Sequence, residues 1–456
     1  MTSESTAPGV ARCLGLLVCA LAACDETATV AAGLPTVART PDAFAGIGRV
    51  APAGDTGGAS GGLEAGTDAG TQWAAPLTLK FVDIPHDAPL LRATDLAFLP
   101  NGSGEFLWLD KDGDVHHLRL DGDRARRLGG FRVPDAWFDS DAGLLSVTFD
   151  PAFTQNGFFY LGTAISMQTS IIRRYHFDAK DYAATAASGV EILRVTGDAA
   201  QRSWHNIGSI GFTDDGLLWA FFGDKTLDDP AQDPASMLGS LVRIRPRLGP
   251  EGGYDTPDDN PYTALGGDPA VYAKGMRSPW KGLYYDGRWF FGDVGLDTAE
   301  EVNLIDAPGL NFGWPIAEGP CESSCDALTD PWIWYDRSSS HPFVAEDAEA
   351  VPARLRSVWV GWVYRTDWPG AENDPYLGRW NEVLTFGDWA TGFVRGRRLP
   401  TGERDGGRDW PVAHLYRSTA WTQAPDGYVY ATALGTWPAD SPNITPSPLL
   451  RAVLAD

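Results

Sequence analysis

The sequence is short of positive charge. Lys and Arg number 36 against 60 Asp and Glu, so the formal net charge is −24. Binding a polyanion requires clustered Lys and Arg, so this balance argues against a nucleic-acid partner and against electrostatic docking to anionic lipid. An acidic surface alone indicates solubility and identifies no substrate.

Long apolar runs and several signature motifs are missing as well. The apolar stretch at 13–23 is too short to cross a bilayer as a helix. No Gly-rich phosphate loop, nucleophile elbow or H-E-x-x-H helix stands out, which argues against a nucleotide cofactor. No long amphipathic helix pattern occurs, which favours an all-β chain.

Residues 1–23 have the features of an export signal peptide, with Arg12 before an apolar stretch that ends in small residues. Leu21-Ala22-Ala23-Cys24 has the form of a bacterial lipobox, in which the sulfur of Cys24 takes a diacylglyceryl group. The alternative, a buried helix of the domain, lacks a core partner in the segment that follows. We therefore expect an exported bacterial lipoprotein of the cell envelope, facing the periplasm or the outer surface, held to the membrane by its lipid anchor only.

Residues 24–75 form the expected lipidated N-terminus and a flexible linker. The segment is rich in Ala, Gly, Thr and Ser, as in Ala53–Gly62, and it has almost no aromatic residue before Trp73. Such a composition cannot bury enough apolar surface to offset the entropy of ordering. Residues 76–456 are then the folded domain.

The folded domain repeats one pattern, an apolar strand, a tight turn and a second apolar strand. The turns of this pattern are Asp112-Gly113, Asn156-Gly157, Asp215-Gly216, Asp286-Gly287 and Asp426-Gly427. Asp-Gly favours two-residue hairpin turns. Such turns fit any β architecture, and a propeller accommodates the length by repeating sheets around an axis. The segment Leu449–Leu454 is expected to close the ring by pairing with an N-terminal strand such as Leu77–Val82.

Two cysteines remain in the folded domain, Cys321 and Cys325. An even pair four residues apart in an exported protein predicts a local disulfide. A metal site is the alternative, although no second ligand pair lies nearby in the sequence.

Four motifs resemble the glucose/sorbosone dehydrogenase family in sequence and in order. They are GLLSVTFDPAF at Gly143–Phe153, HNIGSIGF at His205–Phe212, YAKGMRSPW at Tyr272–Trp280 and the stretch Phe291–Gly319. The resemblance covers the chain from about Leu77 to its C-terminus. It implies a six-bladed β-propeller that uses pyrroloquinoline quinone (PQQ) with calcium to oxidise a sugar.

His205 is the catalytic residue that this resemblance implies. The histidine of the family motif is the general base that takes the hydroxyl proton of the sugar, and a neutral imidazole suits that task. The alternative is a histidine that only hydrogen-bonds between blades.

Several other residues would hold the cofactor. Arg277 and Ser278 stand where the family has an Arg-Asn pair, Arg365 where it has a Lys or Arg, and Arg417 where it has a further arginine. Guanidinium groups suit planar recognition of carboxylates. The alternative for each arginine is a solvated surface charge. Asp141 stands where the family has a Gln or Glu facing the pocket.

The calcium ligands implied by the resemblance are the main-chain carbonyls of Gly295 and Leu296, and hard oxygen ligands suit Ca²⁺. Glu300 falls where the family has a carboxylate near the active site. Glu301 and Asn303 either fix this loop structurally or bind a second calcium.

Three departures from the family pattern cluster at the expected site, namely Ile207, Ser278 and Leu296. The first hypothesis is a PQQ-dependent dehydrogenase that oxidises an aldose to its lactone and passes electrons to an external acceptor. The second is a non-catalytic propeller that binds a glycan or a protein, because the architecture also serves binding roles, as in hedgehog-interacting proteins. A metal-dependent lactonase would require Asp141, Asp224 and Asp293 to converge on one cation.

Overall fold

The computed structural model describes six stretches of the chain, 76–198, 203–323, 325–337, 356–401, 408–435 and 445–455. The predicted signal peptide, the lipidated Cys24 and the linker lie outside the described residues. Within these stretches, no helix has the length and apolar character needed to cross a bilayer.

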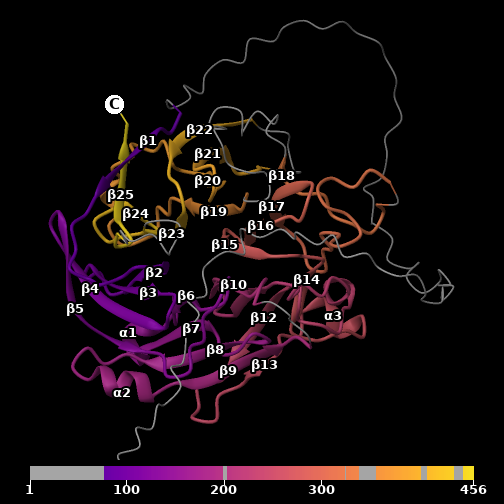
Figure 1. The fold of residues 1–456 in the computed structure, drawn as a ribbon, viewed down its shortest axis with the longest axis horizontal. Coiled ribbons are helices and arrows are strands. Elements are labelled where there is room, and N and C mark those ends of the chain that lie inside the picture. Colours follow the sequence, from indigo (N-terminus) through magenta and orange to yellow (C-terminus); the bar gives the residue numbers. More distant parts are fainter. Residues whose placement is uncertain are drawn as a thin grey trace, which may run out of the picture. The chain divides into compact units, whose positions relative to one another are not determined.

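The described strands form six antiparallel sheets (Figure 1). Blade one comprises β2 (Ala93–Phe98), β3 (Glu105–Asp110), β4 (Asp114–Asp121) and β5 (Arg124–Arg132). Blade two comprises β6 (Leu144–Phe149), β7 (Phe158–Ala164), β8 (Thr169–His176) and β9 (Val190–Thr196). Blade three comprises β10 (Ile207–Phe212), β11 (Leu218–Phe222), β12 (Ser240–Pro246), β13 (Tyr254–Asp255) and β14 (Val271–Lys274).

The remaining three blades repeat the same order from one edge of the sheet to the other. Blade four comprises β15 (Pro279–Tyr285), β16 (Arg288–Asp293), β17 (Ala299–Ile305) and β18 (Ile333–Asp336). Blade five comprises β19 (Val358–Val363), β20 (Val383–Asp388), β21 (Phe393–Arg398) and β22 (Asp409–His414). Blade six comprises β23 (Ser418–Gln423), β24 (Val429–Ala433), β25 (Leu449–Leu454) and β1 (Leu79–Asp83).

The first strands of the blades close a ring around one axis. β2 contacts β6, β6 contacts β10, β10 contacts β15, β15 contacts β19, β19 contacts β23, and β23 contacts β2 again. These six innermost strands surround the centre of the view in Figure 1. The predicted six-bladed β-propeller is therefore confirmed.

The last blade takes strands from both ends of the folded domain. β1 pairs antiparallel with β25, in a register that runs from Leu79 opposite Leu454 to Asp83 opposite Leu450. This confirms the expected pairing of Leu449–Leu454 with an N-terminal strand. Because the ring closes through this sheet, blade six cannot be complete without β1.

Short turns and large aromatic side chains explain why these residues form blades. Asp286 and Gly287, between β15 and β16, have φ values of 50° and 75°, the positive values that a tight hairpin of this kind requires. Between blades, Trp359 and Trp421 stack with ring centroids 5.5 Å apart, and both are almost fully buried. Wide rings of this kind fill the wedge between neighbouring sheets.

Helices are few and short in the described stretches. They are α1 (Phe153–Asn156), α2 (Tyr182–Ala187), α3 (Pro261–Ala264) and the 3₁₀ turns η1 (Asp229–Gln232) and η3 (Ala371–Asn373). The side chain of Asp181 caps α2 by accepting a hydrogen bond from the Ala184 N–H.

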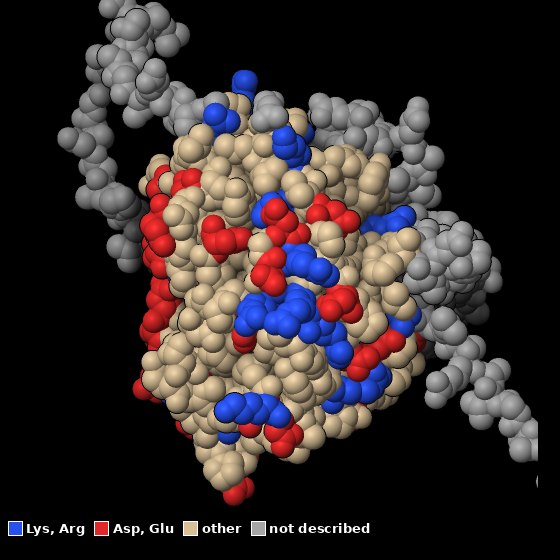
Figure 2. All heavy atoms as spheres, turned by 90° about the vertical axis from the view of Figure 1, so that its left-hand side faces the viewer, with Lys and Arg blue, Asp and Glu red and all other residues tan. Residues whose placement is uncertain are grey.

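Basic side chains are unevenly distributed over the surface. Figure 2 shows Lys and Arg gathered in a band on the face that includes the outer strands of blade one. Arg124, Arg126 and Arg127 of β5 are exposed. The net negative charge therefore does not describe every face of the molecule.

We predict that Leu79→Ala lowers the free energy of unfolding by about 2–4 kcal/mol, because Leu79 is buried in the sheet that closes the ring. Denaturant unfolding measures this loss. Val82→Ala on the same strand is the control, because Val82 is 38% exposed. Equal losses in the two variants would show that the β1 contact does not stabilise the ring.

Candidate functional site

The innermost strands run in the same direction along the axis of the propeller, so the ring has two distinct ends. We call the end at their first residues the His205 mouth and the end at their last residues the Arg365 mouth. A cavity of about 50 Å³ lies at the His205 mouth. It is lined by Thr94, Asp141, Leu145, Asn206, Ile207, Ser278, Pro279, Trp280, Val294, Trp389 and Thr419.

His205 lies directly before β10 and is oriented by a buried carboxylate. Its Nδ1 lies 2.5 Å from Oδ1 of Asp224, and Oδ2 of Asp224 accepts a hydrogen bond of 2.8 Å from Nε1 of Trp314. In the neutral imidazole with Nδ1 donating to Asp224, Nε2 is an acceptor, and no described residue contacts it by hydrogen bond. The contact with Asp224 therefore fixes the orientation of the His205 imidazole, which can act as a base through Nε2.

The charge on Asp224 is supported by its neighbours. Burial disfavours ionisation of Asp224, but the charge and hydrogen bond of His205 and the nearby Arg277 outweigh this cost and lower its pKa. An ionised Asp224 stabilises the imidazolium that would form when His205 takes a proton.

Asp141 is the second acidic group of the His205 mouth. Its Oδ2 accepts a hydrogen bond of 3.2 Å from the backbone N–H of His205, while its buried Oδ1 has no hydrogen-bond partner in the part of the chain that the structure describes. Burial raises the pKa of Asp141, and the charges of His205 and Lys111 oppose this effect. An acceptor left without a donor at the wall of a cavity costs free energy until a ligand hydroxyl reaches it.

Lys225 lies behind the cavity on a strained loop. Its Nζ donates to Oδ1 of Asn206 and to Oγ of Ser170, and burial lowers the pKa of Lys225 to about 8. Lys225, Thr226 and Asp228 all have positive φ values, between 53° and 62°. Such conformations cost a non-glycine residue of order 1 kcal/mol each, so the surrounding contacts must impose this loop shape.

The backbone of Arg277 and Ser278 is held beside the site by Asp293, the last residue of β16. The two oxygens of Asp293 accept hydrogen bonds from the backbone N–H groups of Arg277 (2.9 Å) and Ser278 (2.6 Å). The guanidinium of Arg277 lies over the ring of Trp314, with its carbon 5.3 Å from the ring centroid. Arg277 thereby connects the turn before β15 to the His205–Asp224 pair.

The family model described as glucose/sorbosone dehydrogenase matches residues 90–335, which include His205, Asp224, Arg277 and Trp314. The chain belongs to the glucose/sorbosone dehydrogenase family. Solved structures agree on the fold. The PQQ-bound aldose sugar dehydrogenase of Streptomyces coelicolor is 20% identical, with a TM-score of 0.63, and the match covers 84% of this chain and 100% of that one.

Other relatives are similar over part or all of the propeller. The apo-form of the soluble aldose sugar dehydrogenase of Escherichia coli is 19% identical with a TM-score of 0.61, covering 83% of this chain and 100% of that one. The HIPL1 protein of Arabidopsis thaliana is 27% identical over 237 residues, 40% of this chain. HIPL2 from the same plant is 25% identical over 266 residues, 44% of this chain. The matches span 34% and 38% of these two curated relatives' own length.

The calcium expected from the family does not fit the carbonyl of Gly295. This oxygen accepts hydrogen bonds of 2.9 Å from Nη1 of Arg277 and of 2.9 Å from Nη1 of Arg337. A carbonyl has two lone pairs, and both point here at guanidinium groups, whose charge repels a cation. The expectation that Gly295 ligates calcium therefore does not hold in this arrangement.

The neighbouring carbonyl of Leu296 belongs to a loop that is held by Glu318. Oε1 of Glu318 accepts hydrogen bonds from the backbone N–H groups of Leu296 (2.7 Å) and Thr298 (3.0 Å). No group of three or more His, Cys, Asp or Glu residues in the described stretches is placed to hold a metal. The convergence that a lactonase requires of Asp141, Asp224 and Asp293 is not among the described contacts.

The PQQ of the family does not fit the cavity either. Among the described residues, no Lys or Arg lines this cavity, whereas Asp141 does. A carboxylate-rich quinone would therefore meet an acidic group in the lining and no Lys or Arg there. The volume of about 50 Å³ lies below the roughly 300–1,000 Å³ typical of ligand pockets, so a ligand at this mouth, whether quinone or sugar, would enter the cavity with only part of its structure.

Two predicted cofactor residues lie elsewhere. Glu300 is fully buried, pairs with Arg337 and accepts a 2.8 Å hydrogen bond from the Val358 N–H, so it links blades four and five and does not line the cavity. Arg365 follows β19 and lines the cavity of the opposite mouth. Its position in the sequence matches a basic residue of the family pattern. Arg365 lies past the end of β19, however, at the opposite end of the axis from His205.

Arg417 lies on the side of the His205 mouth without reaching the cavity. Its backbone N–H donates to Trp389 O (2.8 Å), and its Nη1 donates to Gly435 O (3.0 Å).

Glu301 accepts hydrogen bonds from the Gly319 N–H (2.6 Å) and from Nδ2 of Asn303 (2.9 Å). These contacts favour the structural alternative for Glu301.

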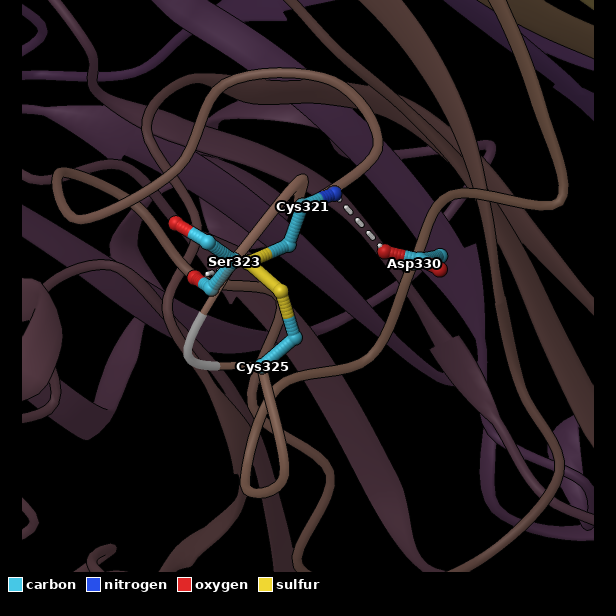
Figure 3. The surroundings of a disulfide bond; sticks show 4 residues. All are labelled: Cys321, Ser323, Cys325 and Asp330. Atoms are coloured by element: carbon cyan, nitrogen blue, oxygen red, sulfur yellow. Dashed lines mark hydrogen bonds between the residues drawn. A yellow bond between two sulfur atoms is a disulfide. The ribbon is translucent and has the colours of Figure 1, made fainter.

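The loop between β17 and β18 contains the predicted disulfide, Cys321–Cys325. Figure 3 shows its sulfurs bonded to one another and the Cys321 N–H donating to Oδ1 of Asp330, at 2.9 Å. The alternative metal site is thus wrong, because neither sulfur is free to ligate.

The sequence did not identify the partners of His205. In the sequence, Asp224 only follows the apolar run Leu217–Gly223, and the fold brings it to the imidazole, together with Trp314 from a loop 90 residues away. The segment Lys225–Asp229 that follows contains no glycine, so the sequence carries no local signal for the positive φ values of this turn.

We predict that calcium does not stabilise the protein. Millimolar CaCl₂ should leave the thermal unfolding midpoint unchanged relative to EDTA, because the Gly295 carbonyl is taken by two arginines. Differential scanning calorimetry measures this. Any calcium-dependent rise of this midpoint in the wild-type protein would contradict the prediction.

A second prediction concerns the pH dependence of stability. Burial raises the pKa of Glu301 to about 7, and Asn303 and Gly319 only partly oppose it. The stability that comes from protonated Glu301 is therefore complete below the unfolded-chain pKa of about 4.5 and is lost as pH rises through about 7.

Glu301→Gln should remove part of this pH dependence and raise the free energy of unfolding at pH 8 by about 1–2 kcal/mol. The glutamine can still accept from the Gly319 N–H and can donate to the Asn303 amide oxygen, which in the wild type has no partner among the described residues. Urea unfolding at pH 5 and pH 8 tests this, with exposed Glu322→Gln as the control. An unchanged pH profile in Glu301→Gln would refute it.

Proposed function

We propose that the protein binds a sugar at the His205 mouth, where His205 and Asp141 accept hydrogen bonds from its hydroxyl groups. The observation that carries this proposal is Asp141 in the cavity lining, because its Oδ2 accepts from the His205 backbone N–H and its buried Oδ1 has no hydrogen-bond partner among the described residues. Two acceptors on adjacent side chains suit two hydroxyl donors of one ligand.

The rest of the cavity lining supports a neutral ligand. Thr94 and Thr419 bring hydroxyl groups, and Trp280 and Trp389 bring aromatic surface that suits the apolar face of a sugar ring. The lining offers no cation for an anionic ligand. The family relationship agrees with a sugar as the ligand class.

Oxidation of the bound aldose to its lactone, with PQQ and calcium and an external electron acceptor, is the second candidate. The His205–Asp224 pair favours it, because a base oriented in this way converts a hydrogen bond from the substrate hydroxyl into proton transfer to Nε2. PQQ is bound in the Streptomyces coelicolor relative. The cavity lining, however, offers no Lys or Arg among the described residues to pair with the carboxylates of the quinone.

The binding experiment is isothermal titration calorimetry with a panel of aldoses, beginning with D-glucose. We expect Asp141→Asn to weaken binding about tenfold or more, since it replaces a carboxylate acceptor beside His205 with an amide, a loss of roughly 1.4 kcal/mol. Asp258→Asn, at an exposed aspartate, is the matched control. Equal affinity in wild type and Asp141→Asn would refute the assignment of the site.

The second candidate is tested in the same preparation. PQQ and calcium are added, and aldose-dependent reduction of an artificial dye is measured for wild type and His205→Ala. Turnover that is lost in His205→Ala would establish the dehydrogenase and place its base. Sugar binding without turnover would leave the sugar-binding role alone.

We also propose that Cys24 carries a lipid anchor and that the protein is an exported lipoprotein of the cell envelope. Expressed in a bacterial host, the full-length protein should fractionate with membranes and take up labelled palmitate. Cys24→Ser should abolish both. Membrane association that persists in Cys24→Ser would contradict the anchor.

A further inference from the structure

We propose that the Arg365 mouth is a second ligand site, which takes a neutral, hydroxyl-bearing ring such as a monosaccharide or a cyclic polyol. It lies at the opposite end of the axis from the proposed sugar site and does not depend on it. The proposal rests on the size of the cavity, its aromatic walls, its strand edges and the pairing of its charges.

The cavity at the Arg365 mouth has a volume of about 430 Å³. This lies within the roughly 300–1,000 Å³ typical of sites for small organic ligands. Residues from all six innermost strands line it, among them Phe98, Phe149, Phe212, Tyr285, Val363 and Thr422. Because each blade contributes, the shape of the site is fixed by closure of the ring.

Aromatic side chains dominate the outer wall. Tyr284, Tyr285, Trp362 and Trp368 line the cavity and are each only half buried, so their rings are accessible. Flat rings of this kind pack well against the C–H face of a saturated ring.

The strand edges supply hydrogen-bonding groups. Each innermost strand is the last strand of its sheet, so one edge of its backbone faces the axis without a neighbouring strand. An edge of this kind presents alternating N–H donors and C=O acceptors. Two contacts illustrate how polar groups use these edges: the Val147 N–H donates to Oδ2 of Asp95 (3.0 Å), and the Gly282 N–H donates to Oγ of Ser209 (3.1 Å). A ligand with several hydroxyl groups matches donors and acceptors together.

The charged side chains that line the cavity are paired or hydrogen-bonded within the protein, and Asp150 accepts from the Ala152 N–H, from Nδ2 of Asn156 and from the Tyr160 hydroxyl. Nζ of Lys281 donates to Thr94 O (2.9 Å) and lies 3.6 Å from Oδ1 of Asp95. The guanidinium of Arg365 is paired with Asp367 through two hydrogen bonds. An anionic or cationic ligand would have to break these pairs, so a neutral ligand is favoured.

The Lys281–Asp95 ion pair separates this cavity from the cavity at the His205 mouth. Thr94 and Trp280 line the cavity at the His205 mouth, whereas their chain neighbours Asp95 and Lys281 line the cavity at the Arg365 mouth. The buried pair thus lies at the boundary between the two cavities. A ligand at one end does not reach the other, and the two sites can be removed separately.

The test is calorimetric titration of the full-length protein with D-glucose and with myo-inositol, supported by saturation-transfer NMR. Thr148→Trp fills the cavity from β6, where Thr148 is half buried in its lining. Tyr285→Ala removes an aromatic wall and serves as the second variant if Thr148→Trp does not fold. Asp141→Asn alters only the other mouth.

We expect at least one of the two probes to bind wild type and Asp141→Asn, and this binding to fall at least tenfold in Thr148→Trp and clearly in Tyr285→Ala. If the same ligand also binds at the His205 mouth, the wild-type protein binds two molecules of it. Asp141→Asn and Thr148→Trp then each bind one molecule, because each variant loses a different site. Binding that is unchanged in folded Thr148→Trp and Tyr285→Ala, or absent for both probes, would overturn the second site. Loss in Asp141→Asn alone would support the proposed function and refute this inference.

Discussion

The antiparallel register that joins β1 to β25 determines whether the ring of blades can close. Residues from the beginning and the end of the folded domain meet in blade six, and Leu79 and Leu450 are buried in the same apolar cluster as Trp359 and Trp421. Both mouths of the channel draw residues from several blades. The positions of Asp141 and His205, like those of Asp95 and Lys281, therefore depend on a closure made far from either site.

The His205 mouth combines features that each cost free energy. A positive φ at His205, the strained turn at Lys225 and Thr226, and an unmet acceptor on Asp141 lie close together. A propeller core with many buried aromatic residues can offset local costs of this kind, which are of order 1–3 kcal/mol each. Strain and unmet polar groups gathered beside an oriented base are typical of a binding or catalytic site.

The same mouth differs from a quinone-and-calcium centre in its charges. Arg277 and Arg337 occupy the Gly295 carbonyl, and the cavity between the blades is small and lined by Asp141 without a cation. His205 and Asp224 form a hydrogen-bonded pair at this mouth. The proposed sugar binding would use His205 and Asp141, whereas calcium binding would need the Gly295 carbonyl, which the two arginines already contact.

The sequence by itself indicated an all-β chain of repeated hairpins, because turn residues, strand length and aromatic content are local properties that repeat blade by blade. The order of the four family motifs then indicated the six-bladed propeller. The sequence also indicated His205 and the Cys321–Cys325 bridge, both of which lie within short motifs. Tertiary structure alone decided that Asp224 and Trp314 meet His205, that Glu300 is sequestered by Arg337, and that Arg365 opens at the opposite mouth. The physical reason is that a residue near the start of an innermost strand and one past the end of another differ little in sequence pattern. Only the common direction of the strands around the axis assigns them to opposite ends.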